Sequence, residues 1–165
     1  LPFIIVDANS KLDIDGAVIG MLITAQMVGA MLSNIVWGKL SFKGLNKLIA
    51  IITISMTIVA IILAFVANNI YVYMCIFFLI GASMDGNRIS SGNLILIIAP
   101  EEKRPVYSAL QNNIVSLGMF FSIFGGIVLT FTSYSVLYFL TIVLLCISLY
   151  MAFQLKDNIE KIDNN

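Results

Sequence analysis

Three long stretches without a charged residue dominate the sequence. They run over Gly16–Gly38 (23 residues), Leu48–Met84 (37 residues) and Pro105–Leu155 (51 residues). A single helix needs only ~20 apolar residues to cross the hydrocarbon layer of a membrane, which is ~30 Å thick. The first stretch is therefore long enough for one membrane span, and each of the other two is long enough for more than one.

The overall composition excludes an ordinary soluble domain. Apolar residues make up 60% of the chain, charged residues only 11%, and the mean hydropathy is +1.02. Soluble domains carry about 25% charged residues, so this chain cannot coat a globule with charge, and the lipid bilayer is its expected partner. Nine basic residues balance nine acidic ones, which argues against a basic surface for nucleic acid.

Polar residues divide the two longer stretches, at Asn68-Asn69 and at Thr132–Ser135. Only helices and closed barrels satisfy their backbone hydrogen bonds in lipid, and the apolar runs lack the alternation that a barrel strand requires. The predicted fold is therefore all-α and polytopic. We expect five transmembrane helices and a helix stub at residues 1–6, with spans at about 16–36, 48–67, 70–98, 106–131 and 135–155.

These spans divide the chain into three parts. Residues 1–15 are expected to hold the end of a preceding transmembrane helix and an extracytoplasmic loop, residues 16–155 the membrane domain, and residues 156–165 a cytoplasmic tail. The orientation follows from basic residues, which favour the cytoplasmic side. One set of connections carries seven of them and the other set only Lys11; the seven are Lys39, Lys43, Lys47, Lys103, Arg104, Lys156 and Lys161.

Small residues recur every fourth position on two of the spans. Such spacing places them on one helix face, where a neighbouring backbone can come close. The predicted packing positions are Gly20 and Gly29 on the first span and Gly118, Ser122 and Gly126 on the fourth. Packing is the favoured interpretation over a direct role in binding a substrate.

The residue types argue against an enzyme. The chain has no His, the most frequent general base and metal ligand, and its carboxylates, apart from Asp85, are expected in loops. No glycine-rich phosphate loop precedes a Lys-Ser/Thr pair, which argues against an ATP-driven pump. We expect no catalytic residues, no cofactor and no metal, and we interpret Cys75 and Cys146 as packing residues because both lie in apolar runs.

The third span contains the unusual residues. An ionisable group inside a membrane span costs ~2.5–3.5 kcal/mol on insertion scales and persists where it faces a protein interior or a water-filled cavity. Asp85 and Arg88 are three residues apart, so they share a helix face and can pair. They either line a substrate pathway, together with Asn87, Ser91 and Gln26, or form a structural ion pair.

The connection after the first span carries a motif. Gly38, Leu40 and Lys47 match the cytoplasmic motif Gly-x-Leu-x-Asp-Arg-x-Gly-x-Arg/Lys of the major facilitator superfamily, and Lys43 stands where that motif has Arg. Phe42 replaces the acidic residue, so the resemblance is partial.

Two further segments are similar to the same family. Residues 99–110 resemble the connection between its tenth and eleventh helices, and Gly125-Gly126 with Tyr138-Phe139 resemble its last hairpin. The resemblance implies that the five spans are the eighth to twelfth helices of a secondary transporter, whose amino-terminal half is missing from this chain. Family membership implies alternating access with a small-molecule substrate, which the sequence does not identify, in the cell membrane. The alternative is a multi-pass scaffold or assembly partner that does not transport.

Overall fold

The computed structural model describes residues 2–155, apart from the side chains of residues 119–122. Lys156 and Lys161 of the predicted tail, and the side chain of Ser122, therefore lie outside the described residues. The described backbone is helical, as predicted, with short connections. Its elements are α1 (Pro2–Leu12), α2 (Gly16–Phe42), α3 (Asn46–Val66), α4 (Ile70–Ile98), the short 3-10 helix η1 (Glu101–Lys103), α5 (Arg104–Phe131) and α6 (Tyr134–Gln154).

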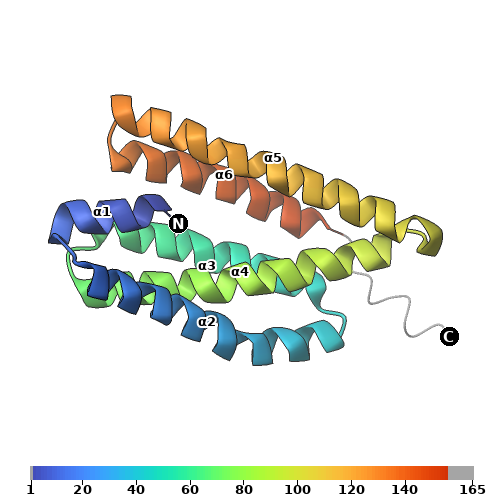
Figure 1. The fold of residues 1–165 in the computed structure, drawn as a ribbon. Coiled ribbons are helices and arrows are strands. Elements are labelled where there is room, and N and C mark those ends of the chain that lie inside the picture. Colours follow the sequence, from blue (N-terminus) through green and yellow to red (C-terminus); the bar gives the residue numbers. More distant parts are fainter. Residues whose placement is uncertain (1, 156–165) are drawn as a thin grey trace.

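Helices α2 to α6 lie beside one another, and successive helices run in opposite directions (Figure 1). Within the described part of the chain, five helices are long and apolar enough to cross a membrane, which confirms the five predicted spans. The connections 43–45 and 99–103 lie at one end of the bundle, here called the basic end. The connections 13–15, 67–69 and 132–133 lie at the opposite end. This alternation separates the basic connections from the others, as the predicted topology requires.

Helix α2 is longer than predicted and reaches Phe42 instead of residue 36. A single lysine, Lys39, does not end a helix; the chain turns only at Gly44, which has a φ of 74°. The Gly44 amide donates to the Ser41 carbonyl at 2.9 Å and the Leu45 amide to the Leu40 carbonyl at 3.1 Å. This pattern is a glycine-dependent helix end, and it places Gly38 and Leu40 of the motif inside α2 instead of in a loop.

Helix α1 is also longer than predicted, because it continues past the apolar residues 1–6 to Leu12. Asp7 and Lys11 lie one turn apart in it and form an ion pair at 3.0 Å. Ile4, Asp7 and Ala8 are buried against the other helices. Asp7 therefore corrects the expectation that every carboxylate except Asp85 lies in a loop.

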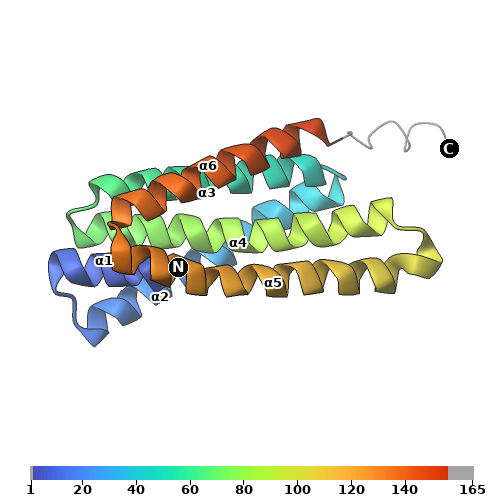
Figure 2. The same cartoon turned by 90° about the horizontal axis from the view of Figure 1, so that it is seen from above.

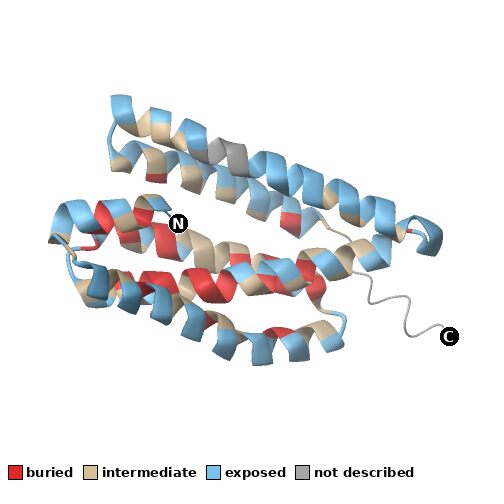
Figure 3. Ribbon diagram, in the orientation of Figure 1, coloured by how far each residue is buried: buried red, intermediate tan, exposed pale blue. Residues whose placement is uncertain are grey.

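The core of the described residues lies around α4. This helix packs between α2 and α3, and α6 packs against the other side of α3. Figure 2 shows the same helices after a turn of 90° about the horizontal axis. Buried residues concentrate on α1, α3 and α4, whereas the described residues of α5 are exposed or half-buried (Figure 3).

Candidate functional site

Two glycines allow α2 and α4 to touch backbone to backbone. A Cβ atom built on Gly29 of α2 would collide with the Phe78 carbonyl of α4, and one built on Gly81 of α4 would collide with the Gln26 carbonyl of α2. Gly81 lies on the third predicted span, four residues before Asp85, where the lack of a side chain leaves room for a ligand or a partner helix. In the structure a neighbouring helix, α2, occupies that room.

A third close approach lies nearer the basic end. A Cβ atom on Gly86 would meet the Trp37 indole at 2.9 Å and the Thr53 methyl group at 2.5 Å. The indole is buried, and its Nε1–H donates to the Ala82 carbonyl at 2.9 Å. These contacts hold α2, α3 and α4 together next to Asp85, which also contacts α2.

The charged residues of α4 do not pair with each other. The Asp85 carboxylate instead accepts a hydrogen bond at 3.0 Å from the side-chain amide of Asn34 on α2. Arg88 is exposed, and among the described residues no carboxylate lies within ion-pair distance of it. The structural ion pair, which the sequence left open, is therefore not formed in this conformation.

The other three candidates have different surroundings. Ser91 donates to the Asn87 carbonyl at 2.7 Å, so its hydroxyl is satisfied by its own helix. The Asn87 side chain is exposed. Gln26 lies on α2, where its amide contacts the Met84 sulfur at 3.9 Å, a weak acceptor. Gln26 therefore contacts α4 at Met84 and makes no hydrogen bond with Asp85 or Arg88 within the described part of the chain.

Asn34, Asp85 and Arg88 form a polar patch across α2 and α4, whereas Asn87, two residues from Asp85, does not share its helix face. The patch presents a carboxylate, an amide and a guanidinium, and its residues are exposed or half-buried. Such a patch can hold a small polar or charged group by hydrogen bonds and ion pairing. The described residues contain no cluster of metal-ligating side chains, so the patch offers polar recognition, not a metal centre.

Sequence reasoning missed Asn34. It lies in the span predicted at 16–36, where the neighbouring residues Ile35 and Val36 are apolar. An amide at that depth is a signal of the same kind as Gln26, and only the contact with Asp85 distinguishes the two.

A second polar group lies at the basic end, near the motif residues. The Asn93 amide of α4 donates to the Ser41 hydroxyl at 2.6 Å, and Ser90 donates to the Asn46 carbonyl at 2.7 Å. Gly38 and Leu40 lie in the last turns of α2, Lys43 caps that helix and Lys47 lies in the first turn of α3. Neutral hydrogen bonds therefore connect this turn to α4, although Phe42 stands where the motif has an acidic residue.

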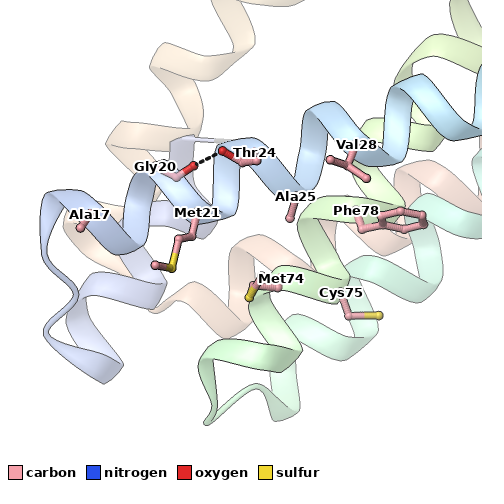
Figure 4. Close-up of a pocket in the computed structure, with 9 residues that line it drawn as sticks. All are labelled: Ala17, Gly20, Met21, Thr24, Ala25, Val28, Met74, Cys75 and Phe78. Carbon is pink, nitrogen blue, oxygen red and sulfur yellow. Dashed lines mark hydrogen bonds between the residues drawn. The ribbon is translucent and has the colours of Figure 1, made fainter.

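An apolar cavity of about 690 Å³ lies between α2 and α4, toward the end opposite the basic one (Figure 4). The labelled side chains are apolar apart from Thr24, which donates to the Gly20 carbonyl at 2.8 Å, and Cys75. None of the predicted pathway residues lines this cavity. It is therefore separate from the polar patch and suited to apolar groups.

Three of the predicted packing residues make no close helix contact. A Cβ atom on Gly20, Gly118 or Gly126 would meet nothing within 4 Å among the described residues. Gly20 borders the apolar cavity, and Gly118 lies beside a second apolar cavity between α1, α3, α5 and α6.

The comparisons with known proteins agree with this membrane architecture. A family model described as Major Facilitator Superfamily matches residues 1–164. No curated protein and no solved structure matches the chain. Since the family model covers nearly the whole sequence, the chain belongs to the major facilitator superfamily, and it is a multi-pass membrane protein of a transporter family.

Proposed function

We propose that this chain takes part in secondary active transport of a small solute by alternating access. The observation that carries the proposal is the polar patch on α2 and α4, in which Asp85 binds Asn34 and Arg88 has no carboxylate partner among the described residues. A guanidinium inside a membrane span is costly unless it faces water or a ligand. If the two charges served only to join helices, Asp85 would be expected to pair with Arg88. Asp85 instead binds Asn34.

The patch also needs an opposite wall. In transporters of this kind the substrate site lies near the middle of the membrane, between two repeats that rock against each other. We propose that an amino-terminal half supplies the second wall, and that the exposed polar face of α4 is turned toward it. Specificity would then depend on side chains from both halves.

The test uses the complete transporter and three variants, Asp85→Asn, Arg88→Gln and the double variant. If the two residues contact solute or a coupling proton, uptake should fall at least tenfold in all three, while membrane expression stays normal. Asn87→Ala, at an exposed position that does not share the helix face of Asp85, is the matched control and should alter uptake less. Near-normal uptake by the double variant would contradict a pathway role. If the unchanged protein transports nothing from a broad panel of solutes, the alternative of a scaffold is favoured instead.

We further propose that the basic end is cytoplasmic, including the tail after α6. The support is the bias of basic residues, which is seven to one between the two sets of connections. The described connections of each set lie at the same end of the bundle.

Cysteine labelling tests this topology. Phe42, Asn68 and Ser133 are exposed and lie at connections, so single cysteines can replace them after Cys75 and Cys146 have been removed. A thiol reagent that does not cross membranes should label positions 68 and 133 in intact cells, and position 42 only after permeabilisation. The reverse pattern would invert the topology.

A further inference from the structure

A buried carboxylate lies outside the polar patch, near the end opposite the basic one. Asp7 of α1 is only 1% exposed. Its Oδ2 atom accepts from the Tyr73 hydroxyl of α4 at 2.9 Å and pairs with the Lys11 ammonium at 3.0 Å. Lys11 also donates to the Ala64 carbonyl of α3 at 3.3 Å. One acidic side chain thus connects three helices.

Within the described part of the chain, two buried polar atoms at this place lack a hydrogen-bond partner. They are Oδ1 of Asp7 and the hydroxyl of Tyr138 on α6. The Tyr138 hydroxyl nevertheless lies within electrostatic range of the Asp7 carboxylate. An unsatisfied buried polar atom costs about 1–3 kcal/mol, and here an acceptor without a donor lies near a donor without an acceptor.

The surroundings favour a direct contact between the two side chains. The Tyr138 ring packs edge-on against Phe65 of α3, with ring centroids 5.4 Å apart. This packing restricts the Tyr138 ring, whose hydroxyl lies within electrostatic range of Asp7. A metal ion is not favoured there, because Lys11 already neutralises the carboxylate and a second cation would leave a buried positive charge.

We propose that the Tyr138 hydroxyl donates to Asp7 Oδ1, so that this carboxylate clamps α1 to α4 and α6 and, through Lys11, to α3. The charged and titratable groups that face Asp7 are Lys11, Tyr73 and Tyr138, with Tyr134 beside them on α6. The clamp makes α1 move as one body with the three helices. That consequence rests on the proposed alternating access, but the contact itself does not.

The sign of one substitution tests the contact. Tyr138→Phe removes a single oxygen atom from the full chain in lipid nanodiscs. If the hydroxyl donates to Asp7, its removal leaves Oδ1 without a donor, and the melting temperature should fall by several degrees. If the hydroxyl has no partner, its removal relieves a buried unsatisfied group, and the melting temperature should stay the same or rise. Tyr71→Phe, at a position that is 75% exposed, is the matched control.

A double-mutant cycle identifies the acceptor. In an Asp7→Leu background, Tyr138→Phe should lower the melting temperature no further, since the shared interaction is already lost. Additive losses would overturn the proposal. Asp13→Asn, an exposed carboxylate at the same end, controls for loss of charge.

A distance measurement tests the clamp even if Asp7→Leu does not fold. Spin labels at Asn9 on α1 and Ser135 on α6, both exposed, report the separation of the two helices. The distribution of label-to-label distances should be narrow in the labelled protein with Tyr138 intact and broader in the Tyr138→Phe variant. An unchanged distribution, even with a lower melting temperature, would overturn the clamp. Neither readout depends on uptake, so the outcome is independent of whether the transport proposal holds.

Discussion

The seam between α2 and α4 and the exposed helix α5 carry the same sequence pattern but differ in structure. Helix α2 of the seam and helix α5 both have small residues four positions apart. On the seam, Gly29 and Gly81 lie against the backbone of the facing helix, whereas Gly118 and Gly126 of α5 have open space within 4 Å. The spacing of small residues shows where a neighbouring helix could pack closely. It does not show that such a helix is packed there.

The difference follows from how helices associate in lipid. Burying apolar surface against another helix gains little when the alternative is an acyl chain, so close van der Waals contact and hydrogen bonds decide the packing. The seam has both kinds of contact, because Trp37 adds a hydrogen bond to the Ala82 carbonyl. Helix α5 contacts α4 and α6 much less extensively.

The largest expected effect is a large side chain on the seam. Gly81→Leu would drive a side chain into the Gln26 backbone, which cannot rotate away. Adding a side chain to a well-packed contact typically lowers the free energy of unfolding by about 1–3 kcal/mol. Because this side chain would clash with backbone, we expect a cost at or above the upper end of that range. We expect loss of the folded protein, measured as monodisperse yield by fluorescence-detected size-exclusion chromatography.

Gly126→Leu is the matched control on α5. Its side chain enters open space within the described residues, so the yield should remain close to that of the unchanged chain. Equal losses at the two positions would show that a partner absent from this structure covers Gly126, and the comparison between seam and α5 would no longer hold.

The fold could be predicted from the sequence where lipid leaves few alternatives. Uncharged stretches of sufficient length must be helices, and the third span was predicted with the bounds that α4 has. The ends of α1 and α2 were wrong for a physical reason. Charged residues were read as helix ends, yet Asp7 and Lys11 pair within α1, and α2 continues through Lys39 to the glycine turn at 43–45.

The candidate site was predictable only in part. The cost of an ionisable group in a span identified Asp85 and Arg88. The possible ion pair between them was inferred from their spacing alone. Spacing cannot show that an amide on another helix, that of Asn34, binds Asp85 instead. The Asp7 cluster joins residues 66 positions apart in the sequence, and no local pattern indicates such a contact.

The smallest effect we predict compares two glycines under the same substitution. Gly44 ends α2 with a φ of 74°, where a Cβ atom costs about 1 kcal/mol. Gly126 lies inside α5 with open space around it, where alanine favours the helix by about 1 kcal/mol over glycine. Gly44→Ala should therefore lower the melting temperature in nanodiscs by a few degrees, and Gly126→Ala should raise it slightly. A rise for Gly44→Ala would show that the turn does not hold this backbone conformation. A marked fall for Gly126→Ala would reveal a close neighbour of α5, and α5 would then have to be regarded as a second packed seam.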